Sequence, residues 1–342
     1  MKVKNKLYIM GIIVVLMNIF GGVTFAAPNK GEDFKNLEQI DNLFYLKGKK
    51  EPYSGEVTVF YKNGTPFQKA NLLNGMLQGQ LTQYYEDGKL YRTISYKNGL
   101  MDGMGKTYSN ENGELSETAV YKNGEKNGWW TRYWSDESKS RGQFIDGKEN
   151  GKWEEYRFGK IALEGYMLDG EKNGEWKRYF QGTDLISNVS VFKMGIIDGK
   201  SIEYYENGKI KLIQYYNMGE QVGTWKRFYD DESLMWEETY VNGAINGEAK
   251  SYKKNGDLQA TYTYVNGELN GISKEYHEGW LQREEFYKNG LLDGRSVNYS
   301  KSGHISSESF YKAGKLVEKI IYIYDFSGNV VEKNVIKGDI DS

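Results

Sequence analysis

Side chains that commonly carry out chemistry are few in this chain, and their spacing matches no catalytic or metal-binding motif. Cysteine is absent, and the only histidines, His277 and His304, stand well apart in the sequence, so the ligand sets that zinc prefers are missing. Acidic doublets such as Glu154–Glu155 would point their carboxylates to opposite faces of a strand, which does not make a general acid/base pair. The run Asp230–Asp231–Glu232 is expected to fill a solvated turn. We therefore predict no catalytic residue, no metal and no cofactor.

Aromatic residues are the more informative set. The chain has 29 Tyr, 14 Phe and 8 Trp, and seven of the tryptophans lie within residues 129–236. Because Tyr and Trp are frequent anchors of protein interfaces, this concentration suggests a binding surface. The alternative is that the aromatic rings only shield a thin sheet. The candidate binding residues are Trp130, Trp134, Trp153, Trp176, Phe180, Tyr205, Trp225 and Tyr229.

Glycines define the elements that would position these aromatics. Pairs of glycines four residues apart recur along the chain, and the second glycine of each pair returns every 23 to 25 residues from Gly55 to Gly294. A short regular period indicates a tandem array that grows by stacking units. The glycines assigned a structural role in the central units are Gly124, Gly128, Gly147, Gly151, Gly170, Gly174, Gly219 and Gly223.

The residues around the glycines predict β-hairpins. Half of the 41 glycines follow Asn or Asp, and such dipeptides favour the positive φ of tight hairpin turns. The runs between turns are rich in Tyr, Trp, Val, Ile and Thr, as strands are. The three prolines all precede residue 67, as expected for a continuous hydrogen-bonded ladder. The predicted fold is all-β: an elongated array of hairpins, about 24 residues each, forming one antiparallel meander.

Alternation along the strands separates the two faces of the predicted sheet. The fifth residue after the second glycine is aromatic in all eleven units, for example Tyr179 and Phe228. We therefore assign that position to the core. We also assign to the core the aromatic residue that stands three positions before the next glycine, such as Tyr216. The second and sixth positions, which hold the candidate binding residues, are placed on the opposite face.

The two ends of the chain differ from the array. Residues 1–26 are predicted to be a signal peptide, with Lys2, Lys4 and Lys6 before an apolar stretch and small residues before the cleavage site. Residues 27–50 would form an N-terminal cap or linker, in which residues 34–44 suit a short amphipathic helix, the alternative being a linker ending in a strand at 43–46. The array spans 51–314, and 315–342 would be a C-terminal β cap and polar tail whose charges discourage edge pairing.

Charge excludes one class of partner. The chain has 45 basic and 47 acidic side chains, for a formal net charge of −2, and neither sign is clustered in a stripe. Nucleic acid is therefore not an expected partner.

The repeat also resembles a known family. YKNGEKNGWWTRYW (121–134) and YMLDGEKNGEWKRYF (166–180) are similar to the bacterial variant of MORN repeats, the kind found in YwqK-family antitoxin-like proteins. The resemblance implies a β-hairpin array used for binding. We therefore expect a non-enzymatic, exported protein-binding or adhesion module that is on the bacterial surface, secreted or periplasmic. The alternatives are an antitoxin that neutralises a toxin and an envelope glycan-binding protein. A protein is the expected partner, with a polysaccharide or a membrane surface also possible.

Overall fold

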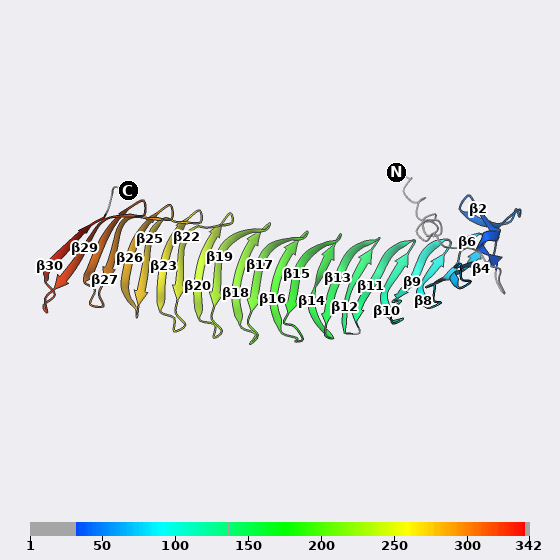
Figure 1. The fold of residues 1–342 in the computed structure, drawn as a ribbon, viewed down its shortest axis with the longest axis horizontal. Coiled ribbons are helices and arrows are strands. Elements are labelled where there is room, and N and C mark those ends of the chain that lie inside the picture. The colour runs from blue at the N-terminus through cyan, green and yellow to red at the C-terminus, as the bar shows by residue number, and fades with distance from the viewer. Residues whose placement is uncertain (1–31, 136, 339–342) are drawn as a thin grey trace. The chain divides into compact units, whose positions relative to one another are not determined.

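The computed structural model describes residues 32–338 with the exception of residue 136. The predicted signal peptide lies outside the described residues. The described chain is β-structure apart from one short 3-10 turn, and it divides into two compact units, residues 1–171 and 172–342. The predicted all-β array of hairpins is confirmed in both units, each of which lays its strands side by side in chain order as an antiparallel meander (Figure 1). Among the described residues, no helix is long and apolar enough to cross a membrane.

Unit 1 opens with a cap that differs from our prediction. The predicted helix over residues 34–44 is wrong, because a turn at Asp41 and Asn42, both with positive φ, reverses the chain. The segment instead forms a 3-10 turn, η1, and a hairpin of β2 and β3, and β1 pairs in parallel with β4. The cap elements are β1 (Glu32–Asp33), η1 (Phe34–Asn36), β2 (Leu37–Ile40) and β3 (Leu43–Leu46).

The cap covers the one aliphatic cluster of the described chain. Leu37 and Phe44 of the cap pack with Leu81, Ile94 and other buried residues of the first hairpins. The apolar spacing that suggests a helix therefore serves hairpin packing. The remaining strands of unit 1 are β4 (Gly55–Phe60), β5 (Pro66–Leu73), β6 (Met76–Leu77), β7 (Gly79–Tyr84), β8 (Leu90–Lys97), β9 (Leu100–Tyr108), β10 (Leu115–Lys122), β11 (Glu125–Ser135), β12 (Ser138–Ile145), β13 (Lys148–Arg157) and β14 (Lys160–Leu168).

Unit 2 repeats the hairpins, and its described residues form no comparable cap. Its strands are β15 (Glu171–Tyr179), β16 (Ile186–Lys193), β17 (Ile196–Tyr204), β18 (Ile210–Asn217), β19 (Glu220–Phe228), β20 (Leu234–Val241), β21 (Ala244–Ile245), β22 (Gly247–Tyr252), β23 (Leu258–Val265), β24 (Glu268–Leu269), β25 (Gly271–His277), β26 (Trp280–Lys288), β27 (Leu291–Tyr299), β28 (Ile305–Lys312), β29 (Lys315–Tyr324) and β30 (Val330–Lys337). β29, although predicted as part of a cap, continues the same meander.

The first glycine of each pair ends a tight two-residue turn, here called the first turn. From Asn74 to Ala313, the residue before that glycine has φ between 47° and 52°, and the glycine has φ between 75° and 93°. Positive φ at both central residues defines the type I′ turn, whose twist matches that of the flanking strands. The glycine N–H also reaches an earlier hairpin, as when Gly219 donates to the Ile197 carbonyl at 2.8 Å. The first turns thus stack along one edge of each unit.

The second glycine is required for a different reason. It also has positive φ, but in several units a side chain from the neighbouring strand covers it: Val120 lies over Gly128, and Tyr215 lies over Gly223. A β-carbon at Gly128 would stand only 3.1 Å from the Val120 β-carbon. The pair of glycines therefore provides one turn and one close approach between strands.

Candidate binding surface

The predicted division of the two faces is wrong at the second position. Trp176 and Trp225 are only 3% and 6% exposed, and the Trp225 ring lies 5.4 Å from the Tyr216 ring and 4.5 Å from the Tyr240 ring. The second position therefore shares the core face with the aromatic residue that stands three positions before each first-turn glycine.

The fifth position, which we predicted to be the core, is half-buried in every unit. The reason is the place of each residue along its strand. Trp225 is in the middle of β19, with β18 and β20 on either side, whereas Phe228 is the last residue of the strand. A single-layer sheet buries most completely what lies in the middle of its strands.

Trp130 and Trp153 are half-buried and stack on each other at 5.6 Å. They fit because the residues paired opposite them are small: Trp130 pairs with Ala119 and Gly142, and Trp153 pairs with Gly142 and Gly165. A β-carbon at Gly142 would collide with the Trp153 ring. This large-to-small pairing is visible in the sequence, and it indicates packing rather than a free surface.

The sixth-position tyrosines join successive hairpins. The Tyr205 hydroxyl donates to the Phe228 carbonyl at 2.7 Å, and the Tyr229 hydroxyl donates to the Tyr252 carbonyl at 3.0 Å. Tyr61 and Tyr85 of unit 1 make the same bond to residues 84 and 108. Tyr205 and Tyr229 therefore act as staples within the array. Phe180 is also half-buried, whereas Trp134 is 60% exposed, so of the eight predicted residues Trp134 presents the most open ring.

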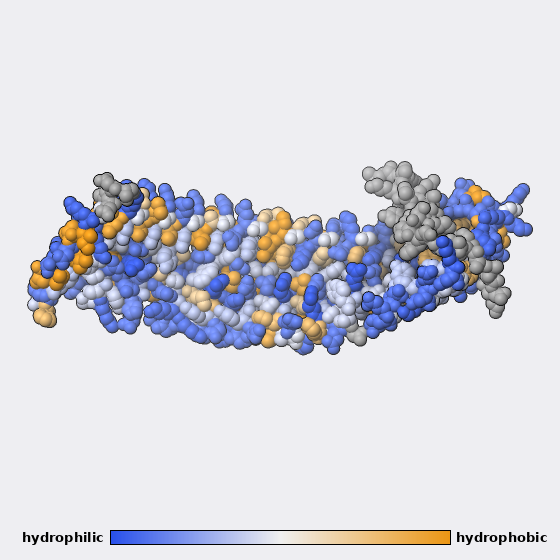
Figure 2. Space-filling view, viewed as in Figure 1, coloured by the Kyte–Doolittle hydropathy of each residue, from blue (hydrophilic) through white to orange (hydrophobic). Residues whose placement is uncertain are grey.

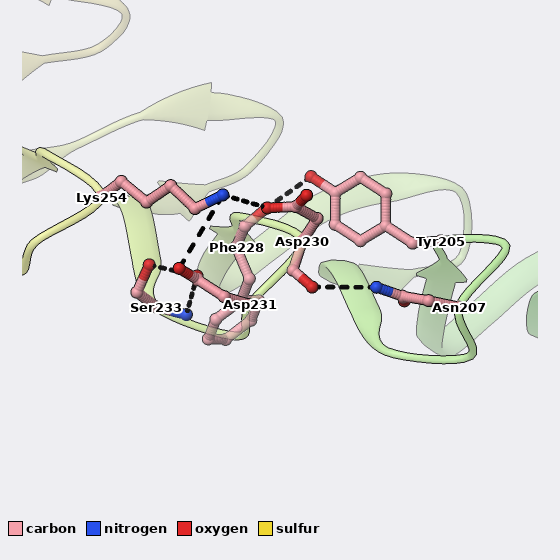
Figure 3. A network of polar contacts seen from close by, with 7 residues as sticks. All are labelled: Tyr205, Asn207, Phe228, Asp230, Asp231, Ser233 and Lys254. Carbon is pink, nitrogen blue, oxygen red and sulfur yellow. Dashed lines mark hydrogen bonds and ion pairs between the residues drawn. The ribbon is translucent and has the colours of Figure 1, made fainter.

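The turns at the opposite edge from the first turns are held by polar contacts (Figure 3). Asp231 accepts hydrogen bonds from the Ser233 N–H and hydroxyl, and the Lys254 ammonium lies 2.6 Å from an Asp230 carboxylate oxygen. These contacts hold the pKa of both aspartates below the usual range, through Lys254 for Asp230 and through Ser233 for Asp231. Asn207 donates to the Asp230 carbonyl at 2.9 Å. The acidic run is thus a turn tied to its neighbours.

A row of exposed apolar side chains lies along the first-turn edge of unit 2. Six large apolar residues there are between 43% and 53% exposed, and hydrophobic groups line this edge in Figure 2. Sequence reasoning missed this edge because its members occupy different repeat positions, on either side of the turn glycine. We call this set the apolar edge: Met194, Ile196, Met218, Val241, Val265 and Leu291.

Two turns of the apolar edge have an unusual residue at their first central position. Met194 and Met218 both have φ of 47°, where Asn or Asp stands in most of the first turns. A left-handed backbone is costly for a residue with a long side chain, and Asn and Asp adopt it more easily. Met194 and Met218 nevertheless leave their side chains about half exposed. The signal was present in the sequence as Met-Gly in place of Asn-Gly.

Side chains of preceding strands accept hydrogen bonds from the backbone of the two methionine turns. The Met218 N–H donates to an Asp198 carboxylate oxygen at 3.2 Å, and the Met194 N–H donates to the Asn173 side-chain oxygen at 3.4 Å. Ile196 lies beside the next turn, with its Cγ2 3.3 Å from where a Gly219 β-carbon would stand. Ile196 and the Met218 turn are therefore neighbours on a supported edge.

Little in the described chain supports chemistry. No group of three or more His, Cys, Asp or Glu side chains in the described residues could hold a metal ion. The perturbed tyrosines are packing residues: burial and a hydrogen bond to Glu285 raise the pKa of Tyr287 to about 12. The feature that the described residues do offer is the exposed apolar edge.

Comparisons with known proteins agree with the fold. The hairpin array defines the chain as a β-hairpin repeat protein. Residues 77–98, 197–218, 245–266 and 269–289 match the family model described as MORN repeat variant, so the chain contains MORN-type repeats in both units. The narrower likeness to the YwqK family stays a prediction.

Two solved structures match this chain at low sequence identity. The crystal structure of TcdB2-TccC3 is 10% identical, with 87% of this chain and 20% of that chain covered and a TM-score of 0.17. The Photorhabdus luminescens Tc holotoxin pore is 11% identical, with 81% of this chain and 20% of that chain covered and a TM-score of 0.12. This chain spans about a fifth of the length of both, and likenesses of this size carry no argument about function. No match was found among curated proteins.

Proposed function

We propose that this MORN-type repeat protein is an exported, non-enzymatic module that binds a protein partner through the apolar edge of unit 2. The observation that carries the proposal is the pair of exposed methionines at Met194 and Met218, each at a left-handed backbone position. A residue held in a disfavoured conformation costs about 1–3 kcal/mol, and such residues cluster at functional sites. Methionine side chains are flexible and recur on surfaces that adapt to protein partners.

The chemistry of the edge favours a protein over a glycan. Its exposed residues are aliphatic and thioether side chains, whereas sugar rings are best matched by flat aromatic faces, and most of the tryptophans are packed into the sheet. Export rests on the leader predicted at residues 1–26. In this role the hairpins form a rigid support and the first turns provide the contacts.

The test uses the double variant Met194→Asn/Met218→Asn. Asn suits the left-handed turn position, so the variant should be at least as stable as the wild type and should bind its partner at least about tenfold more weakly. Partners would be captured by wild-type chain from envelope extracts of the producing bacterium and from cultured host cells, identified, and titrated as purified proteins against both chains.

Leu73→Asn is the matched control, because Leu73 is an equally exposed apolar residue beside a first turn of unit 1. It should leave binding unchanged. The proposal fails if purified partners bind the double variant as tightly as the wild type, or if Leu73→Asn weakens them equally. Protease treatment of intact cells, with lysed cells as reference, tests export separately: protection until lysis would contradict display on the outer surface.

A further inference from the structure

The last strand of the described chain, β30, is an open edge. It pairs along one side with β29, and no other described strand pairs with its second side. All eight of its residues are exposed, including Val330, Val331, Val335 and Ile336. At the start of the array in unit 1, by contrast, β4 is covered by β1. Charges at the C-terminal end are predicted to discourage edge pairing, but four apolar side chains of β30 remain uncovered.

An open strand with unpaired backbone groups is a template for another strand. The residues of β30 point to which strand that is. Around Lys333 the sequence Val330–Val331–Glu332–Lys333–Asn334–Val335–Ile336 is nearly a palindrome in chemical type. Two apolar residues and one polar residue stand on each side of the lysine. Such a strand is complementary to itself when it runs antiparallel.

We propose that β30 pairs antiparallel with β30 of a second copy of this chain, in the register centred on Lys333. A two-fold axis perpendicular to the sheet keeps every side chain on its own face, so only registers that place one residue opposite its own copy are allowed. Centring on Lys333 places Val331 opposite Val335 and Val330 opposite Ile336 of the other copy, twice each. Apolar cross-strand pairs of this kind stabilise antiparallel sheets.

The neighbouring registers are poorer. Centring on Glu332 would place two carboxylates opposite each other and Val331 opposite Lys333. Centring on Asn334 would place Glu332 opposite Ile336 and Val331 opposite Lys337. Like charges and apolar–charged pairs are unfavourable at directly opposed positions. In the proposed register only Lys333 faces its own kind, and its ammonium already lies 5.1 Å from the centre of the Tyr322 ring of its own chain.

The absence of cysteine allows a clean cross-linking test on the full chain. In Lys333→Cys the two sulfurs belong to directly opposed residues, with Cα atoms about 4.5–5.5 Å apart, a separation that a disulfide spans. Mild oxidation should yield a covalent dimer. Val331→Cys is the control, because residue 331 and its copy would be offset by four residues, about 14 Å along the strand. An equal mixture of Val331→Cys and Val335→Cys chains should cross-link to each other.

Equal cross-linking of Lys333→Cys and Val331→Cys, or none in Lys333→Cys, would overturn the register. A second measurement avoids engineered cysteines: light scattering should give the wild-type chain about twice the mass of one copy. Val335→Lys should raise the dimer dissociation constant at least about tenfold, because it removes two apolar pairs. A wild-type chain that stays monomeric at about 100 μM, where interfaces with micromolar affinity are saturated, would sink the proposal. Met194→Asn/Met218→Asn should still form the dimer, so this result is independent of the partner-binding test.

Discussion

The first turns of unit 1 and unit 2 share one backbone geometry but differ in their side chains. In unit 1 the residue before each turn glycine is Asn or Asp, from Asn74 to Asp169. In unit 2 the corresponding residues include Met194, Met218 and Ala313. Since all have φ close to 50°, the difference is one of local energy. Unit 1 has Asn or Asp at this position in every first turn, whereas unit 2 has an apolar residue in three first turns and Asn in the others, Asn242, Asn266 and Asn289.

The interiors of the two units also differ, and unit 1 again has the arrangement that favours stability. Unit 1 has an aliphatic cluster, with Leu81 and Ile94 almost fully buried beneath the cap. Unit 2 has no such cluster among its described residues, and its buried large side chains are chiefly single residues such as Trp176, Leu212 and Trp225 along a one-layer sheet. The comparison suggests that unit 1 is optimised for stability, whereas unit 2 gives up some stability to present a surface.

The largest expected effect comes from the core of unit 2. Trp225→Ala removes a ring packed between Tyr216 and Tyr240 and should lower the free energy of unfolding by about 3–5 kcal/mol. Phe228→Ala, in the same strand but half-buried at its end, should cost about half as much. Urea unfolding followed by fluorescence measures both. Equal losses would mean that the fifth position is as much a core as the second.

Removing one staple should have a smaller effect. Tyr205→Phe deletes the hydroxyl that donates to the Phe228 carbonyl and should cost about 1 kcal/mol. Tyr204→Phe is the control, since its hydroxyl has no hydrogen-bond acceptor among the described residues. Thermal unfolding of the two variants gives the comparison. A larger loss from Tyr204→Phe would show that these hydroxyl bonds do not join the hairpins.

Exchanging turn residues between the units tests the comparison most directly. Met218→Asn should stabilise the chain by about 0.5–1 kcal/mol, and the reciprocal Asn123→Met in unit 1 should destabilise it by a similar amount, because Asn tolerates the left-handed conformation better. Midpoints of urea unfolding report both changes. If Met218→Asn is destabilising, the methionine is there for packing, and the functional argument from strain is lost.

The last expected effect appears only at high pH. Burial, followed by a hydrogen bond to Glu285, raises the pKa of Tyr287 to about 12, whereas an unfolded tyrosine titrates near 10. Between these values the folded chain holds a proton that the unfolded chain has lost, so this contribution to stability is full below about pH 10 and declines as the pH rises to about 12.

Tyr287→Phe should therefore flatten the pH dependence of the free energy of unfolding between pH 10 and 12, measured against the wild type. Identical slopes would contradict the assignment. Tyr96 of unit 1 supplies a comparison, because its pKa is raised chiefly by burial and its hydroxyl has no hydrogen-bond partner among the described residues. Tyr96→Phe removes a titrating group without removing a hydrogen bond.

Much of the fold could be predicted from sequence because turn chemistry is local. Asn-Gly at 123–124 and at 289–290 specifies a type I′ turn by its own backbone preferences, and the regular spacing of such turns fixes strand length and order. Strand alternation does not say which face is buried more, so the sequence alone predicts the burial of the second and fifth positions the wrong way round. Their assignment depends on whether a residue such as Trp225 lies mid-strand between two neighbours.

The candidate binding site was the least predictable part. Trp176 and Tyr205 are residue types common at interfaces. In the structure, however, Trp176 is buried in the sheet, and the Tyr205 hydroxyl donates to a carbonyl of the next hairpin. The residues that remain open, such as Met194 and Val241, are less conspicuous by type. Exposure is a property of what surrounds a side chain, and that depends on strands distant in the sequence.

The sequence by itself determined the hairpin unit, its period and its antiparallel connection, because these follow from φ preferences at glycine and asparagine and from strand composition. Only the tertiary structure decided that residues 37–46 form a hairpin, that Trp225 is buried, and that β30 ends the sheet with apolar residues uncovered. Each of these depends on whether a neighbouring strand lies beside the residue, and in a one-layer sheet that neighbour determines most of the burial.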